Sequence, residues 1–416
     1  MRHIAIYAKD HQSVSRLVAD LKKDKMVPGF EDFQHKKGLE HSEAVLQNFI
    51  KEDQRHGNSV LVKAENRSLR TFSSGEKRKA LLEYLLKKEP AYLILDDPFD
   101  CLDMQSVASF KKRLTEVKSD FALLQIFRRE EDILSFIDTV LVFDKARKAV
   151  FKNKADFIEN EKTAIDVSVK TIPPPAREYQ DIPEVLVQLN DVSVFYEERP
   201  ILNQINWTIK KGEFWKLTGP NGSGKTTILS MIYGDNPKAY GVDLVLFGKK
   251  KGSGESVWDI KKKIGYFSPS VTELFIRRNT VEEMVISGLV DSIGLYQKPS
   301  DKQKALAKQW LETLGFQEKA KKVFNDLPNL EKRMLLIARA MIKHPPLLIL
   351  DEPSTGLDDK SALKITHLIN RIAAESSTAI LYVSHRKEKG LHPDFEYELI
   401  SSENGSEGKV VSKFNN

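Results

Sequence analysis

Residues 219–226 read GPNGSGKT, and this stretch decides how the rest of the chain is interpreted. It matches the pattern GxxxxGK[ST] in full, and Thr227 follows it. The segment EFWKLT (213–218) before it predicts a short strand, and TTILSMIY (226–233) after it has the spacing of a helix that Gly234 would end. A strand, a glycine-rich turn and a helix in this order predict a loop that binds phosphate groups.

The residue types in this loop suit a nucleoside triphosphate with Mg²⁺. Gly219, Gly222 and Gly224 allow backbone N–H groups to curl around phosphate oxygens. Lys225 would supply a positive charge to the β- and γ-phosphates, and Thr226 a hydroxyl ligand to Mg²⁺. The predicted nucleotide-binding residues of the loop are therefore Gly219, Pro220, Asn221, Gly222, Ser223, Gly224, Lys225, Thr226 and Thr227.

An acidic pair follows another predicted strand, LLIL (347–350). This strand is apolar on both faces, as in the middle of a parallel sheet, and open α/β sheets bind ligands at the carboxyl ends of such strands. Asp351 is placed to hold Mg²⁺, and Glu352 to orient or deprotonate an attacking water. The alternative, an acidic pair that only caps the next turn, is weaker in a chain that also contains the phosphate loop.

Two further side chains are candidates for contacts with the nucleotide. His385 ends the apolar segment AILYVSH (379–385), where it would contact the γ-phosphate, although a lone histidine is usually structural. Tyr196, in VFYEERPIL ahead of the loop, would stack on the adenine ring or pack within a sheet. Phe195 is the second candidate for stacking.

The chain contains an internal repeat. Residues 73–103 read SSGEKRKALLEYLLKKEPAYLILDDPFDCLD, and residues 328–358 read PNLEKRMLLIARAMIKHPPLLILDEPSTGLD. The two stretches align without a gap, and each predicts a helix followed by a short apolar strand that ends in an acidic pair. The sequence therefore predicts an α/β fold with two homologous P-loop NTPase domains in tandem.

The two copies differ in what precedes the shared stretch. The first copy has no GxxxxGK[ST]. Aligned on the shared stretch, Met1 falls after the place where the half-domain that contains the phosphate loop would have ended. We therefore expect a truncated first domain over residues 1–150, either because that half has been lost or because the start codon is misassigned. A polar linker with the run Pro173–Pro175 is expected over 151–184, and a complete second domain over 185–416.

Composition excludes several classes of protein. The 416 residues are 41% hydrophobic and 30% charged, as in globular proteins, and no apolar run approaches the roughly 18–20 residues that cross a bilayer. The N-terminus lacks the apolar core of a signal peptide, so we expect a cytoplasmic protein, at most peripheral at the inner face of the membrane. A single cysteine, Cys101, excludes a disulfide framework, a four-cysteine zinc site and an iron–sulfur cluster.

Two basic clusters stand out in a chain with a net charge of +6, GKKKGSG (248–254) and IKKKIG (260–265). The simpler interpretation is a solvated surface loop, and the alternative is a contact for a phosphate-rich partner or an anionic membrane surface. No aromatic residues alternate with these lysines, so a nucleic-acid partner is not expected.

Together the motifs resemble those of ATP-binding-cassette (ABC) ATPases. In the second domain the matching motifs are the P-loop GPNGSGKT, the Walker B strand LLILDEP, the D-loop STGLD and the switch histidine of VSH. In the first domain they are the signature FSSGEKR, the strand AYLILDDP and the D-loop DCLD. The segments DLVLFGKKKGSGESVWDIKKKIGYFSPS and VEEMVISGLVDSIGLYQ are similar to the molybdate-transport and photorepair subgroup, which has two cassettes in one chain and no membrane domain.

The resemblance implies how the two domains would share one site. In this family two cassettes meet head to tail, and each ATP lies between the P-loop of one and the signature of the other. The loop Gly219–Thr227 would therefore face four residues of the first domain, Ser73, Ser74, Gly75 and Glu76. The opposite interface would have a degraded signature, in which Pro328 removes an N–H donor and Leu330 adds bulk.

We therefore expect one composite ATP site per chain, or the same pairing between two chains of a homodimer. A P-loop hidden by a misassigned start would still face the degraded signature. Asp97 replaces the catalytic glutamate of the first copy, and Arg128 lies near its switch position.

In the second domain Pro269 stands where the family has a metal-contacting glutamine, which Ser268 or Ser270 would have to replace through water. Slow hydrolysis and altered coupling to a transporter are the expected consequences.

The leading hypothesis is an ATPase that serves as the ATP-binding subunit of an ABC-type transport system or acts on a soluble partner. A second is a regulatory module that binds ATP with negligible hydrolysis. A third is an ABC-type translation factor, for which the Pro-rich linker is shorter than the usual charged arm between cassettes. A fourth is a decayed gene product whose exposed apolar edge would cause aggregation.

Overall fold

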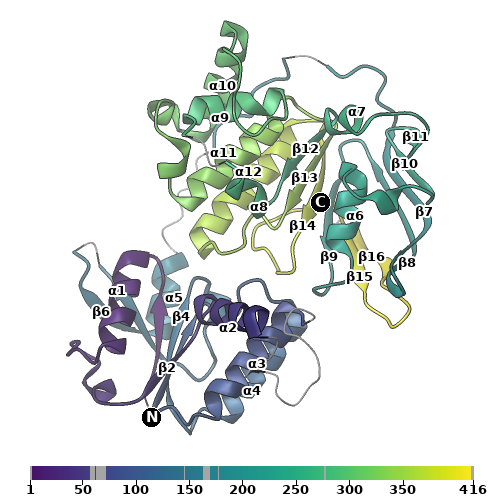
Figure 1. The fold of residues 1–416 in the computed structure, drawn as a ribbon. Coiled ribbons are helices and arrows are strands. Elements are labelled where there is room, and N and C mark those ends of the chain that lie inside the picture. The colour runs from purple at the N-terminus through teal and green to yellow at the C-terminus, as the bar shows by residue number, and fades with distance from the viewer. Residues whose placement is uncertain are drawn as a thin grey trace. The chain divides into compact units, whose positions relative to one another are not determined.

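The structure is a computed structural model that describes residues 2–56, 61, 72–144, 146–162, 169–176, 178–275 and 278–413. The chain forms two compact units (Figure 1). The first comprises Met1–Asp166 together with the short segment Gly356–Lys360, and the second comprises Val167–Thr355 and Ser361–Asn416. Each unit combines β-sheet with helices (Figure 1), so the α/β class that the sequence predicts is confirmed.

The first unit is built on a six-stranded sheet with the strand order β2-β3-β4-β1-β5-β6. The first five strands in that order are parallel, and β6 is antiparallel to β5. The strands are β1 (His3–Tyr7), β2 (Gly38–His41), β3 (Tyr92–Asp96), β4 (Ala122–Phe127), β5 (Thr139–Phe143) and β6 (Ala149–Asn153). The helices are α1 (His11–Lys22), α2 (Glu43–His56), α3 (Ser74–Leu86), α4 (Met104–Glu116) and α5 (Lys154–Lys162), with 3-10 turns η1 (Glu31–Phe33) and η4 (Glu130–Asp132).

The second unit contains a six-stranded sheet of order β12-β13-β14-β9-β15-β16 and an antiparallel four-stranded sheet of order β11-β10-β7-β8. The strands are β7 (Val185–Tyr196), β8 (Arg199–Lys210), β9 (Phe214–Thr218), β10 (Leu244–Leu246), β11 (Lys249–Lys250), β12 (Ile264–Phe267), β13 (Leu347–Asp351), β14 (Ala379–Val383), β15 (Phe395–Ile400) and β16 (Glu407–Lys413).

The helices of the second unit are α6 (Lys225–Tyr233), α7 (Val257–Lys261), α8 (Pro269–Glu273), α9 (Val281–Ile286), α10 (Asp301–Leu314), α11 (Asn329–Met341) and α12 (Asp359–Glu375). Four 3-10 turns accompany them, η5 (Pro237–Ala239), η6 (Ser287–Leu289), η7 (Gln317–Lys319) and η8 (Phe324–Asp326). Of the helices in the described ranges, none has the length and apolar character needed to cross a membrane.

The sheet of the first unit is buried on both faces. Along β3, Leu93 and Leu95 pack into one apolar cluster with residues of α3 and α4. Tyr92 and Ile94 point to the opposite face and pack with residues of α1. Successive side chains of a strand alternate between faces, so an uninterrupted apolar strand such as this one is typical of a sheet covered on both sides. The polar positions are thereby left at the strand ends.

The two six-stranded sheets have the same topology, and this corrects one prediction. Their strand orders match one for one, so β1 corresponds to β9, the strand that precedes the phosphate loop. The place of that loop is taken by Ala8–Asp10, between β1 and α1. The expectation that Met1 falls beyond the half with the loop is therefore wrong. β2, the counterpart of β12, lies between α1 and α3 in the chain, as β12 lies between α6 and α11.

The two units differ in their antiparallel sheet. Among its described residues the first unit has no counterpart of the four-stranded sheet β11-β10-β7-β8. The missing GxxxxGK[ST] motif thus reflects a short turn at the place of the loop, within a sheet that retains its strands.

The predicted linker begins too early in the sequence. Its boundary at residue 150 falls inside β6, which pairs with β5 along its length. α5 follows β6, and its Phe157 is buried in the core of the first unit. The segment near Pro173–Pro175 packs on the second unit, where the backbone N–H of Ile172 donates to Glu375 Oε2 at 2.7 Å.

Candidate functional site

The phosphate loop needs its glycines for steric reasons. Gly219, Gly222 and Gly224 have φ values of 146°, 80° and 93°, which L-residues rarely adopt. A Cβ atom on Gly224 would lie 2.5 Å from Leu202 Cδ2, and one on Gly219 would lie 2.8 Å from the carbonyl oxygen of Leu399. Gly224 is also the N-cap of α6 and brings no side chain to the helix N-terminus. The first amides of α6 therefore have no side-chain cap and face the loop.

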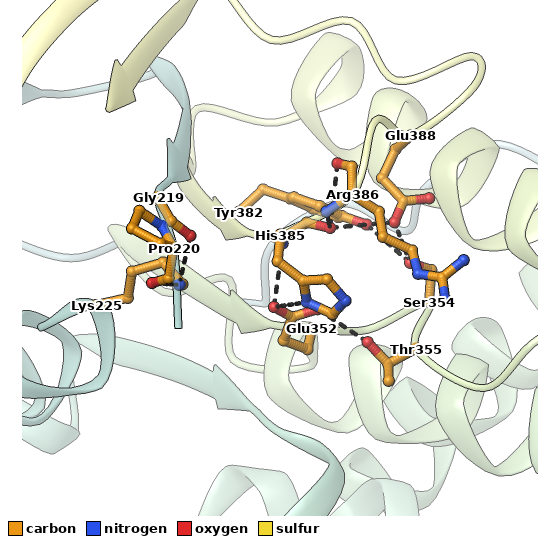
Figure 2. A network of polar contacts seen from close by, with 11 residues as sticks. Gly219, Pro220, Lys225, Glu352, Ser354, Thr355, Tyr382, His385, Arg386 and Glu388 are labelled. Atoms are coloured by element: carbon orange, nitrogen blue, oxygen red, sulfur yellow. Dashed lines mark hydrogen bonds and ion pairs between the residues drawn. The ribbon is translucent and has the colours of Figure 1, made fainter. Parts of the chain in front are cut away.

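Two buried polar side chains complete the loop, of which Lys225 is labelled in Figure 2. Lys225 is 9% exposed, and its Nζ donates to the carbonyl oxygens of Gly219 and Pro220 at 2.8 and 2.9 Å. Ser223 is 1% exposed, and its hydroxyl has no hydrogen-bond partner in the described part of the chain. Buried polar groups are nearly always paired, so a lone hydroxyl beside an uncapped helix end and an ammonium group fits an anionic ligand such as a triphosphate.

The predicted acidic pair lies at the carboxyl end of β13. Glu352 has a φ of 50°, and its carboxylate is held at both oxygens. Oε1 accepts from the His385 backbone N–H at 3.2 Å and lies 2.7 Å from His385 Nδ1, while Oε2 accepts from Thr355 Oγ1 at 2.8 Å (Figure 2). The sheet explains why these residues meet, since β13 pairs with β14, and β14 pairs with β9.

The two carboxyl groups of the pair, those of Asp351 and Glu352, have pKa values shifted in opposite directions. Burial raises the pKa of Asp351 to about 6, with a further contribution from the charge of Glu352 and an opposing one from Lys225. Burial also acts to raise the pKa of Glu352, but its hydrogen bond and charge interaction with His385 outweigh this, so the pKa of Glu352 is lowered. Glu352 therefore ionises at a lower pH than Asp351, and added positive charge would favour ionisation of Asp351.

His385 contacts Glu352 through only one of its two ring nitrogens. An ionised carboxylate only accepts hydrogen bonds, so Nδ1 donates in the pair with Glu352 and Nε2 lies on the other side of the ring. Nε2 is buried and has no hydrogen-bond partner among the described residues. In this respect it resembles the Ser223 hydroxyl of the same unit.

Tyr196 and Phe195 lie at the end of β7, outside the apolar core. They are 42% and 50% exposed. The hydroxyl of Tyr196 accepts from Asn236 Nδ2 at 2.9 Å, and Lys238 Nζ lies 5.7 Å from its ring centroid. An exposed ring fixed at one edge is suited to stacking, which leaves the adenine prediction for Tyr196 open to test.

The segment after β12 contains the hydroxyls that were considered in place of a glutamine. Ser268 is buried, and its Oγ lies 2.8 Å from Ser270 Oγ. Pro269 begins α8 between them. β12 pairs with β13, so these hydroxyls directly follow the strand next to the one that ends at Asp351.

The signature segments of the two units differ at their helix caps. Ser73 caps α3 by a capping box, in which its Oγ accepts from the N–H of Glu76 at 3.2 Å and Glu76 Oε2 accepts from the N–H of Ser73 at 2.7 Å. The equivalent helix α11 begins after Pro328, whose side chain makes no capping bond. The helix thus survives in both units, while the polar cap is present only in the first.

The sheet of the first unit keeps the layout of the site with different chemistry. Asp97 takes the place of Glu352, because its N–H bonds to Ile126 O at 3.1 Å as that of Glu352 bonds to Val383 O at 3.0 Å. Asp97 Oδ2 accepts from Arg128 Nε at 2.7 Å, so an arginine stands where the second unit has His385. Burial raises the pKa of Asp97 to about 6, Asp100 adds to this and Arg128 opposes it.

The turn that replaces the phosphate loop is closed by a carboxylate. Asp10 caps α1 by accepting from the N–H groups of Gln12 and Ser13 at 3.1 and 3.3 Å and from Ser13 Oγ at 2.6 Å. These are the helix-end amides that a phosphate would need. Sequence reasoning missed this feature, although an aspartate directly before an amphipathic stretch is a helix-start signal.

Comparison with known proteins agrees with the geometry. Residues 202–355 match the family model described as ABC transporter. The chain is 39% identical over 334 residues to the ABC transporter ATP-binding protein ModF of Escherichia coli (strain K12), an alignment that covers 78% of this chain and 68% of ModF. It is 30% identical over 329 residues to the uncharacterized ABC transporter ATP-binding protein C323.04 of Schizosaccharomyces pombe, covering 77% of this chain and 66% of that protein.

Two solved structures share the fold over nearly the whole chain. An RNase-L inhibitor structure has a TM-score of 0.63 at 15% identity and covers 98% of this chain and 85% of its own. A model of ribosome-bound archaeal Pelota and ABCE1 has a TM-score of 0.65 at 17% identity, with coverages of 99% and 74%. At these identities the likeness concerns the fold alone.

Proposed function

The chain belongs to the ABC transporter ATP-binding protein family, and from this premise we propose that it hydrolyses MgATP at a single site built on the phosphate loop of the second unit. Members of this family bind ATP. The observation that supports the single site is the contrast between the units. In the second, Ser223 Oγ and His385 Nε2 are buried and have no hydrogen-bond partner in the ranges that the structure describes, whereas in the first Asp10 and the Asp97–Arg128 pair fill the corresponding places.

The residues of the second unit would divide the work as follows. The loop Gly219–Thr227 would hold the phosphates, with Lys225 as the charge. Thr226 and Asp351 would hold Mg²⁺, which neutralises phosphate charge when bound. Glu352 would orient or deprotonate the attacking water, and His385 Nε2 would contact the terminal phosphate. Tyr196 would stack on the adenine.

The first unit would contribute its signature residues. We propose that Ser73, Ser74, Gly75 and Glu76 complete the site, either within one chain or across a homodimer. The capping box that holds Ser73 and Glu76 supports this proposal, as does the loss of that cap at Pro328. On this view the first domain carries a signature without a phosphate loop, and the second is a complete cassette. The partner would be a transporter subunit or a soluble protein.

A regulatory module with negligible turnover is the second candidate. The pair Ser268–Ser270 around Pro269, in place of a metal-contacting glutamine, favours slow hydrolysis. If this candidate holds, ATP binds with the same residues but is not consumed.

Steady-state hydrolysis of MgATP by the purified full chain tests the proposal, with Lys225→Ala as the blank. We expect turnover above that blank. Equal phosphate release by both proteins, with ATP bound only by the unmodified chain, would favour the regulatory module.

The contribution of the signature is tested by Ser73→Ala against Ser300→Ala. Both serines are N-caps of capping boxes, Ser73 for α3 and Ser300 for α10. Each change should cost about 1 kcal/mol of helix stability. Only Ser73→Ala should also lower turnover, and equal turnover in the two variants would remove the signature from the site.

A further inference from the structure

The segments that follow β13 and β14 are joined a second time, away from the Glu352–His385 pair. Glu388 is 8% exposed, and its Oε1 accepts from Ser354 Oγ at 2.5 Å and from Ser384 Oγ at 3.2 Å. Ser354 lies in the segment after β13, and Ser384 directly follows β14. One buried carboxylate oxygen therefore connects the two segments that carry the predicted catalytic residues (Figure 2).

These contacts close a ring. Ser354 is bonded in the chain to Thr355, whose hydroxyl donates to Glu352 Oε2. Ser384 is bonded to His385, which contacts Glu352 Oε1. The ring passes through six residues, Glu352, His385, Ser384, Glu388, Ser354 and Thr355. The hydroxyl of the fully buried Tyr382 adds a contact to Ser354 Oγ at 3.4 Å. Glu388 and Glu352 thus brace the same two segments from opposite ends.

The brace has consequences for the position of Glu352. A buried carboxylate that accepts from two hydroxyls makes bonds stronger than those between neutral groups. Without it, the hydroxyls of Ser354 and Ser384 would lose the acceptor that they share, and both segments could relax. Since each segment supplies a donor to Glu352, its carboxylate would lose a fixed orientation, and small displacements of a catalytic group are costly in rate.

The first unit provides an internal comparison. The gapless repeat places Phe99 where the second unit has Ser354. The strand pairing places Phe127 where the second unit has Ser384. The residue before each is paired equivalently, Ile126 with Asp96 and Val383 with Asp351. Both phenylalanines are fully buried, and Glu131, at the position of Glu388, is exposed. The hydroxyl–carboxylate brace thus occurs in the unit that has the glutamate–histidine pair, and apolar packing replaces it in the other.

We infer that Glu388 is a positioning residue for ATP hydrolysis, which acts through Ser354 and Ser384 to hold Glu352 and His385 in place. The inference rests on the proposed function of the site. It assigns Glu388 no contact with nucleotide, so it predicts an effect on kcat that leaves ATP affinity unchanged.

The experiment compares Glu388→Ala, Glu388→Gln and the matched control Glu131→Ala in the full chain, measuring kcat, KM and the equilibrium affinity for ATP. Glu388→Ala should lower kcat by roughly 10–100-fold, the range expected for a misplaced catalytic group, with KM and affinity within about twofold. Glu388→Gln should recover most of the kcat, because an amide oxygen can accept from the same two hydroxyls. Glu131→Ala should behave as the unmodified chain.

A second set of variants guards against misfolding. Ser354→Ala with Ser384→Ala should reproduce the loss of kcat, and adding Glu388→Ala should lower it little further, because all three belong to one network. Normal kcat in Glu388→Ala, alongside unmodified turnover above the Lys225→Ala blank, would overturn the inference and leave the proposed function intact. Equal losses in Glu388→Ala and Glu388→Gln with a lowered melting temperature would make Glu388 merely structural. Turnover no higher than the blank would remove both proposals.

Discussion

Equivalent acidic residues at the ends of β13 and β3 allow a direct test of which unit is catalytic. Glu352 and Asp97 occupy the same place, with φ values of 50° and 46° and the same backbone bond to the neighbouring strand. Glu352→Gln and Asp97→Asn each replace a carboxylate by an amide of nearly the same shape. If only the second unit hydrolyses ATP, the two changes should have very different effects.

The size of the effect follows from the contacts of Glu352. The glutamine keeps an oxygen that can accept from His385, but it loses the charge that a base needs. Removal of a positioned general base typically costs 10²–10⁴-fold in rate, which corresponds to about 3–5 kcal/mol in the barrier. ATP binding should persist, because Lys225 and the glycine loop are unchanged. For Asp97→Asn the expected change in kcat is less than about twofold, since Asp97 is tied to Arg128 in a unit whose α1 is capped by Asp10.

Phosphate release under saturating MgATP, together with ATP binding at equilibrium, measures both quantities. Circular dichroism of each variant confirms that the chain is folded. The reasoning would be refuted by an Asp97→Asn variant that loses as much turnover as Glu352→Gln, because the first unit would then take part in the chemistry. Retained turnover in Glu352→Gln would also contradict it.

Three further outcomes are expected. Equilibrium binding should give one ATP per chain, and two would mean that the first unit also binds nucleotide. Gly224→Ala should weaken ATP binding at least about tenfold, because its Cβ would meet Leu202 at 2.5 Å, whereas Gly212→Ala, with a φ of 70° and no atom within 4 Å, should not. Burial lowers the pKa of His41 to about 4, so as the pH falls this histidine is protonated in the unfolded chain before it is protonated in the folded chain. Urea titrations should therefore show a free energy of unfolding that falls by about 3 kcal/mol from pH 6.5 to 4, and by less in His41→Gln.

Local motifs were predictable because their chemistry is local. The strand expected over 213–218 is β9, Phe214–Thr218, and the helix expected over 226–233 is α6, Lys225–Tyr233. Glycines with left-handed backbone, an apolar strand and a helix spaced around one lysine leave few alternatives. The location of the acidic pair and of His385 could be predicted because parallel strands place their carboxyl ends at one edge of the sheet.

The first unit was harder to predict because its loop carries no motif. Ala8–Asp10 is a short turn without glycine, so nothing in its composition marks it as the counterpart of a phosphate loop. The boundary at residue 150 failed for a similar reason, since the residues of β6 become recognisable as a strand only through pairing with β5. The bonds of Glu388 to Ser354, across 34 residues, depend on tertiary structure and leave no local signal.

The two units differ in whether their sites are complete without a ligand, and this leads to a last prediction. In the candidate site of the second unit, Ser223 Oγ and His385 Nε2 are buried and have no hydrogen-bond partner among the described residues. Each such atom costs roughly 1–3 kcal/mol until it is paired. In the first unit Asp10 already caps the amides of α1, and Arg128 already pairs with Asp97. ATP should therefore stabilise α6 of the second unit and leave α1 of the first nearly unchanged.

Hydrogen exchange can measure this on matched helices, α6 (Lys225–Tyr233) and α1 (His11–Lys22), which follow equivalent strands. In Glu352→Gln, used so that ATP is not consumed, MgATP should slow exchange in α6 and leave α1 as it was. The Lys225→Ala variant should show no change in either helix. Comparable protection of α1 would mean that the carboxylate of Asp10 does not stand in for a phosphate, and the first unit would then have to be regarded as a second nucleotide site.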